Sequence, residues 1–86
     1  MPVISMFFGI IISMFYSEHA PPHFHAKYQE HKATFNLDGE LIEGDMPSGK
    51  IKFIAAWAEL HKDELAANWE LAENGKELYQ INPLRP

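Results

Sequence analysis

The sequence predicts an α+β fold, with an antiparallel sheet of about four to five strands and one long C-terminal helix packed on one face. Residues 3–43 contain apolar runs and alternating apolar and polar residues between turn signals, which is typical of β-strands. Residues 50–74 repeat apolar residues at three- and four-residue steps, which is typical of an amphipathic helix. The chain has 86 residues, 47% of them hydrophobic, so one small domain over residues 1–86 is expected.

The first predicted hairpin lies in the apolar run from Val3 to Tyr16. We expect strands at Val3–Phe7 and Ile10–Tyr16 on either side of Phe8-Gly9, because β-branched and aromatic residues dominate both. The run is shorter than the ~20 residues that cross a membrane, and no basic segment precedes it. Neither a membrane span nor a signal peptide is therefore expected.

The second predicted hairpin consists of residues 23–28 and 31–37, joined at Gln29-Glu30. Alternating residues indicate one buried face, and apolar residues placed opposite one another determine the register. The apolar pairs are Phe24 with Phe35, Ala26 with Ala33 and Tyr28 with His31. The pairs on the other face are His23 with Asn36, His25 with Thr34 and Lys27 with Lys32. Gln-Glu is a poor pair for a two-residue turn, so a longer turn is an alternative. Ala20-Pro21-Pro22 should form a stiff, extended approach to this hairpin.

The remaining elements follow from local signals. Asp38-Gly39 is a tight-turn pair, which predicts a short returning strand at Glu40–Glu43. Ser48 is a candidate helix N-cap, and Asn74-Gly75 is a stop signal at the other end. No proline interrupts residues 50–74, although the helix could break near His61.

The C-terminal tail, Glu77–Pro86, is expected to run extended against the sheet. Its apolar residues would anchor it there, and these are Leu78, Tyr79 and Ile81.

The histidine-rich segment Glu18–Tyr28 holds three of the five histidines, and this is where we expect a site. Histidine exchanges protons near neutral pH, and lysine binds phosphate as a point charge. The candidate catalytic residues are His23, His25 and Lys27. The candidate binding residues are His19, Lys32, Thr34, Asn36 and Trp57. The alternative is a sheet face whose histidines only pack and form hydrogen bonds.

Metal binding is a further alternative for this segment. His23 and His25 lie two residues apart in a predicted strand, so both side chains would be on one face. If a metal is bound, the expected ligands are His19, His23 and His25, with Glu18 or His31 as other candidates. Otherwise neither a metal nor any other cofactor is expected.

Charge and cysteine content restrict the function classes. The formal net charge of −5 argues against general affinity for nucleic acid, although a local basic patch could bind a particular RNA or phosphate. The absence of cysteine removes thiol chemistry and fits a cytoplasmic protein.

Several segments make the chain similar to the small bacterial domain-of-unknown-function 4160 family. The matching segments are Met1-Pro2-Val3-Ile4-Ser5 with Phe8-Gly9-Ile10, Pro21-Pro22-His23-Phe24-His25-Ala26, Ile42-Glu43-Gly44-Asp45-Met46-Pro47, and Trp57-Ala58-Glu59-Leu60-His61 with Glu64-Leu65, Asn68-Trp69 and Leu71. Members often have Gly-Gly where this chain has Gln29-Glu30. The resemblance implies a neighbouring gene from the domain-of-unknown-function 2442 family, in an arrangement like a toxin–antitoxin module.

These observations lead to three functional hypotheses. The first is the toxin component of such a module, which binds a small cognate protein and could act as a metal-independent ribonuclease. The second is a non-catalytic binding module of the same gene pair, either an antitoxin or a regulator. The third is a protein with a histidine-ligated metal. A homodimer is also reasonable, because extra burial helps so small a core.

Overall fold

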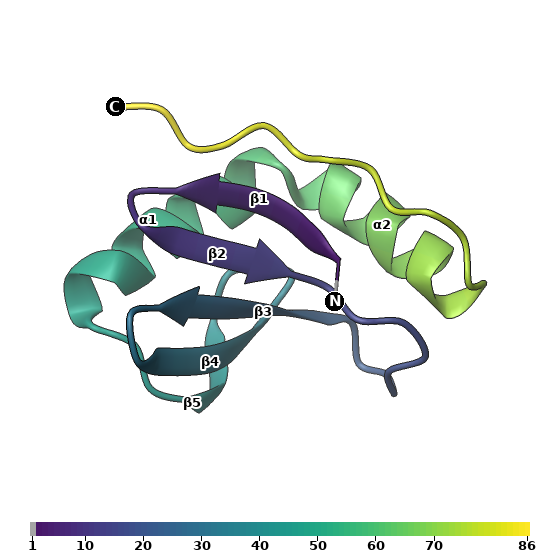
Figure 1. The fold of residues 1–86 in the computed structure, drawn as a ribbon, viewed down its shortest axis with the longest axis horizontal. Helices are drawn as coiled ribbons and strands as arrows, with labels where there is room; N and C mark the ends of the chain where they lie inside the picture. The colour runs from purple at the N-terminus through teal and green to yellow at the C-terminus, as the bar shows by residue number, and fades with distance from the viewer. Residues whose placement is uncertain (1) are drawn as a thin grey trace.

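The computed structural model describes residues 2–86 and contains one antiparallel sheet with two helices. The five strands lie in sequence order, and both helices cover the same face of the sheet (Figure 1). The strands are β1 (Val3–Phe7), β2 (Ile10–Ser13), β3 (His23–Tyr28), β4 (His31–Asn36) and β5 (Leu41–Gly44). The helices are α1 (Ser48–Leu60) and α2 (Lys62–Glu73). The α+β class and the antiparallel sheet are confirmed. Met1, the first residue of the N-terminal segment quoted above, lies outside the described residues.

The predicted register of the second hairpin is confirmed at every pair. Phe24 lies opposite Phe35 on the helix-covered side, and His25 lies opposite Thr34 on the other side. The turn has two residues, Gln29 and Glu30, and Gln29 takes a φ of 53°. Apolar residues thus specified this pairing even though the turn lacks a favourable glycine.

Aromatic packing joins the helices to the sheet. Trp57 of α1 is 0% exposed, and its ring centroid lies 5.3 Å from that of Phe7 and 5.7 Å from that of Phe24. Phe24 in turn stacks on Phe35 with a centroid separation of 5.7 Å. Because these rings come from β1, β3, β4 and α1, they form the centre of the core.

The prediction of one long helix was wrong, because the helical segment divides at His61. This residue has a φ of −121°, outside the helical range, and its side chain contacts Glu64 with 2.5 Å between Nδ1 and Oε1. An unbroken helix over 48–73 would be about 39 Å long, whereas the molecule extends 33 Å along its longest axis. The break lets both halves keep their apolar faces on the core.

The sequence signals predicted the end of α2 correctly but not the N-cap of α1. Ser48 is the first residue of α1 and not its N-cap, because Pro47 occupies that position and accepts from the backbone N–H groups of Lys50 and Ile51. The predicted stop after α2 is confirmed, since Asn74 is the C-cap and Gly75 takes a φ of 66°.

The close approach of β5 to β4 requires a glycine. Gly44 has a φ of 88°, and a Cβ atom there would meet the carbonyl oxygen of Lys32 and lie 2.9 Å from the Cα atom of Ala33. The strand begins and ends one residue later than predicted.

The tail lies along β1, as expected, but one predicted anchor was wrong. The N–H of Ile81 donates to the carbonyl of Ile4 at 2.8 Å, and Ile81 is buried. Tyr79 is 71% exposed, so its ring does not anchor the tail. Its backbone is held by Asn68, a buried residue of α2 whose amide donates to the Tyr79 carbonyl and accepts from the Tyr79 N–H, both at 2.9 Å.

Replacing Asn68 by alanine should destabilise the protein by about 1–3 kcal/mol, because it leaves partly buried polar groups of Tyr79 without partners. Hydrogen exchange should then accelerate in the tail more than in the sheet. Asn74→Ala is the matched control, because its amide also donates to a backbone carbonyl at 2.9 Å but at an exposed helix end. Equal effects of the two variants on stability and on tail exchange would contradict this role for Asn68.

Candidate functional site

The loop between β2 and β3 brings a carboxylate against two histidines. Oε1 of Glu18 lies 2.5 Å from Nε2 of His25 and 3.1 Å from Nε2 of His23. The loop bends at Ala20 and Pro21, so the extended approach predicted for Ala20-Pro21-Pro22 was wrong. We call Glu18, His23 and His25 the carboxylate–histidine cluster.

The ring of His23 is held on two sides. Its Nδ1 lies 2.9 Å from the carbonyl oxygen of Pro21, and its centroid lies 5.1 Å from the ring of Trp69. A carbonyl only accepts hydrogen bonds, so Nδ1 of His23 carries a hydrogen. The other nitrogen, Nε2, is therefore directed at Glu18.

The ring of His25 is held in the same manner. Phe15 packs on it with centroids 4.3 Å apart, and Nδ1 lies 3.4 Å from the Thr34 hydroxyl. When the Nε2–H of a neutral His25 donates to Glu18, Nδ1 keeps its lone pair. That lone pair can then accept a proton.

Glu18 is ionised at neutral pH. Partial burial by itself would raise the pKa of Glu18, but the hydrogen bond and charge of His25, together with those of His23, outweigh it and hold this pKa below its ordinary value. The site therefore contains an anion that both histidines contact.

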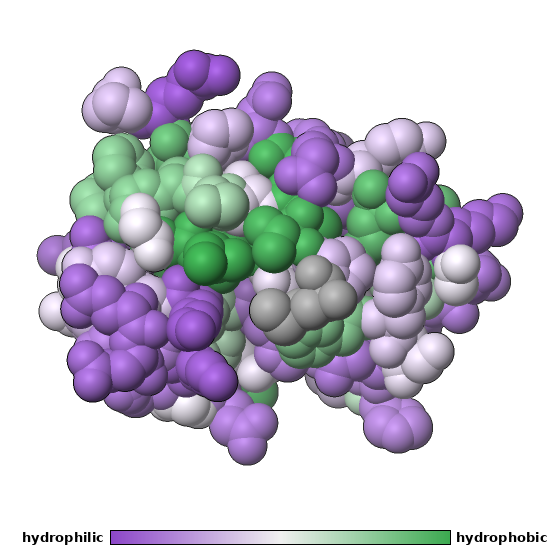
Figure 2. All heavy atoms as spheres, in the orientation of Figure 1, coloured by the Kyte–Doolittle hydropathy of each residue, from purple (hydrophilic) through white to green (hydrophobic). Residues whose placement is uncertain are grey.

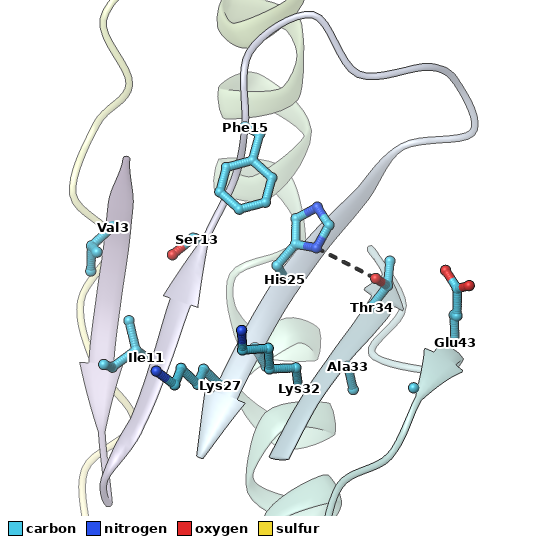
Figure 3. A pocket seen from close by; sticks show the side chains of 12 residues that line it. Val3, Ile11, Ser13, Phe15, His25, Lys27, Lys32, Ala33, Thr34 and Glu43 are labelled. Atoms are coloured by element: carbon cyan, nitrogen blue, oxygen red, sulfur yellow. Dashed lines mark hydrogen bonds between the residues drawn. The ribbon is translucent and has the colours of Figure 1, made fainter. Parts of the chain in front are cut away.

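A groove of about 690 Å³ runs along the face of the sheet that the helices leave uncovered. Figure 3 shows His25 and Phe15 toward one end of this groove, with Lys27 and Lys32 further along it. The remaining lining residues are Val3, Ile11, Ser13, Ala26, Ala33, Thr34, Glu43 and Gly44. The groove thus combines an imidazole, two ammonium groups, the Glu43 carboxylate and an apolar wall.

The two lysines of the groove lie directly opposite each other on β3 and β4. Like charges in that position destabilise a strand pair. Within residues 2–86 neither Lys27 nor Lys32 forms an ion pair. An anion bound between them would relieve their repulsion.

The apolar part of this face lies on the β1–β2 side. Figure 2 shows apolar surface there and hydrophilic surface around the β3–β4 turn. Met6, which pairs with Ile11, is 62% exposed. This side is suited to contact with another apolar surface, whereas the lysine side is suited to an anion.

The predicted site residues fall into separate groups. His25, Lys27, Lys32 and Thr34 share the groove, whereas His23 contacts Glu18 beside it. Asn36 instead holds the following turn, because its Oδ1 accepts from the N–H groups of Asp38 and Glu40, each at 3.0 Å. Trp57 is buried in the core, so a partner cannot reach its side chain. His19 is exposed and is not a member of the carboxylate–histidine cluster.

The structure gives Glu18 and Phe15 a larger part in the site than the sequence predicted. Glu18 was only one option as a metal ligand, because its approach to the histidines depends on the loop. Phe15 was predicted inside a strand, but β2 ends at Ser13. The alternation of Ile11, Ser13 and Phe15 was a usable signal, since it places all three on the groove side.

Two other histidine–carboxylate pairs lie away from the groove. His31 contacts Asp45 at 3.0 Å, and His61 contacts Glu64 at 2.5 Å. Each pair consists of one histidine and one exposed carboxylate, so the two pairs serve as internal controls for the cluster.

Comparisons with known proteins identify a family and no activity. A family model described as "Domain of unknown function (DUF4160)" matches residues 9–70. Searches of curated proteins and of solved structures found no match. Within residues 2–86, no helix is long and apolar enough to cross a membrane.

Proposed function

The chain belongs to the DUF4160 family, and we propose that it is the toxin component of a bacterial toxin–antitoxin-like module that cleaves RNA in the sheet groove. The observation that carries the catalytic part is that His25, which Glu18 contacts, lines one groove together with Lys27 and Lys32. The module and its cytoplasmic location rest on the resemblance and composition described above.

In this proposal His25 is the general base. Its Nδ1 takes the proton from a ribose 2′-hydroxyl, and the 2′-oxygen bonds to the adjacent phosphorus. Glu18 keeps the other ring nitrogen protonated and stabilises the imidazolium that forms. His23 contacts the same oxygen of Glu18 and thereby positions that carboxylate.

The lysines act on the phosphate. Lys32 binds the phosphate oxygens, whose negative charge offsets the repulsion between the two ammonium groups. The P–O5′ bond breaks with its electron pair on the 5′-oxygen, which takes a proton from Lys27. The products are a 2′,3′-cyclic phosphate and a 5′-hydroxyl, and no metal is required.

The cognate partner would cover the open face. The exposed apolar surface over β1 and β2 supports this, because large uncovered apolar patches mark interaction sites. A partner bound there would close the groove to RNA and would therefore inhibit cleavage without any contact to the core.

Expression of the wild-type chain alone should arrest a bacterial host, whereas expression of a folded His23→Ala/His25→Ala variant should not. The purified wild-type protein should cleave RNA in EDTA and leave the two product ends named above. RNA methylated at the 2′-oxygen should resist cleavage, because no proton is available there. RNA affinity should also fall as salt rises.

Other outcomes distinguish the alternatives. Arrest by both proteins would place toxicity on another surface. Arrest by neither, together with no RNA cleavage, would contradict the toxin proposal and favour the non-catalytic binding module. His31→Ala is the matched control, because it removes a histidine from the far end of the same hairpin.

A further inference from the structure

We propose that Glu18, His23 and His25 bind a divalent transition-metal ion of the zinc type. The binding itself does not depend on ribonuclease activity. Its effect on cleavage, described below, rests on the proposed function.

The donor set suits such an ion. Two imidazole nitrogens and one carboxylate oxygen lie within 4.8 Å of one another. Two histidines and one carboxylate are an established ligand combination for zinc and for ferrous iron, and three protein ligands leave positions open for water. Within residues 2–86 this is the one group of three such donors.

The hydrogen bond of His23 to Pro21 determines which ring nitrogen faces the cluster. Nδ1 carries a hydrogen, because a carbonyl oxygen only accepts, so Nε2 is the nitrogen that is placed to bind an ion. This nitrogen lies 3.1 Å from Oε1 of Glu18. A backbone carbonyl on the far nitrogen is also the usual arrangement for a metal-binding histidine.

The cluster needs only a small expansion to hold the ion. Ligand bonds of about 2.0–2.2 Å in a tetrahedral site put the donor atoms about 3.3–3.6 Å apart. Nε2 of His23 is already 3.1 Å from Glu18, and Nε2 of His25 is 2.5 Å away. Glu18 belongs to the loop between β2 and β3, whereas both histidines belong to β3, so the carboxylate is the ligand that has to shift outward. The three side chains are 14–29% exposed, which leaves a path from solvent.

Metal binding would change the tautomer of His25. An ion on Nε2 displaces the hydrogen from that nitrogen, so the single hydrogen of the neutral ring moves to Nδ1. Nδ1 then donates toward Thr34 and can no longer accept a proton from RNA. On the proposed mechanism, zinc therefore inhibits cleavage and EDTA restores it.

The test is titration of untagged protein with CoCl2 or ZnCl2 alone. Wild-type protein should bind one Co²⁺ per chain and show the visible absorption bands of a Co²⁺ ion with few ligands. Added Zn²⁺ should displace the Co²⁺ and remove these bands. His23→Ala and Glu18→Gln, checked for folding, should each weaken binding at least about 100-fold, since losing even a residue that only orients a ligand costs about 10–100-fold. His19→Ala and His31→Ala should bind as the wild type does.

Several results would overturn the proposal. These are no binding by the wild-type protein, unchanged binding by folded His23→Ala, or equal loss in the His31→Ala control. RNA cleavage in EDTA tests the enzymatic proposal separately. Protein that binds Co²⁺ but never cleaves RNA would retain the metal site and lose the ribonuclease. A cleavage rate that is the same in EDTA as in saturating zinc without EDTA would contradict inhibition through the tautomer of His25.

Discussion

Replacement of His25 by glutamine should lower the rate of RNA cleavage in EDTA by about 10²–10⁴-fold, the usual contribution of a general base. Glutamine is close in size and can still contact Glu18 and Thr34, but it cannot accept the proton. The measurement is the cleavage rate at saturating RNA, together with a folding check by circular dichroism. RNA affinity should change little, because Lys27 and Lys32 remain.

The controls separate chemistry from structure. His31→Gln changes the same residue type on the same hairpin, beside Asp45 instead of Glu18, and should cleave RNA at the wild-type rate. Glu18→Gln tests a positioning role, and it should lower kcat while leaving KM nearly unchanged. Equal rates for His25→Gln and the wild-type protein would exclude His25 as the base.

Trp57→Ala should destabilise the fold by about 3–5 kcal/mol, the usual cost of truncating a fully buried large aromatic residue. The ring fills the space between Phe7 and Phe24, and its Nε1–H donates to the Asn82 carbonyl at 2.8 Å. A chain of 86 residues has a total stability of about 4–13 kcal/mol. The variant should therefore lose a large part of its stability in urea unfolding.

Two variants locate the source of this loss. Trp57→Phe keeps most of the packing and loses the hydrogen bond, so its cost should lie near 1–3 kcal/mol. Leu60→Ala removes a large apolar side chain from the same helix, but Leu60 is 69% exposed, and the change should stay within about 0.5 kcal/mol. A Trp57→Ala midpoint equal to that of Leu60→Ala would contradict the central role of the ring.

Local sequence patterns determined the sheet and its central register. The alternation in residues 23–28 and 31–37 allows one pairing that buries Phe24 against Phe35, and a slip of one residue in either strand would turn the ring of that strand to the other face. The same alternation assigned His25, Lys27, Lys32 and Thr34 to one face. Neighbouring residues supply all of this information, because the side-chain period of a strand is two residues.

Tertiary structure decided the features that depend on distant segments. The break at His61 keeps buried residues of both helices on the core, and the burial of Asn68 follows from a tail that begins after α2 ends. The meeting of Glu18 with His23 and His25 depends on how the loop returns to β3. No periodicity encodes the path of such a loop, so the sequence by itself determined which histidines share a strand, and only the folded chain determined which carboxylate they contact.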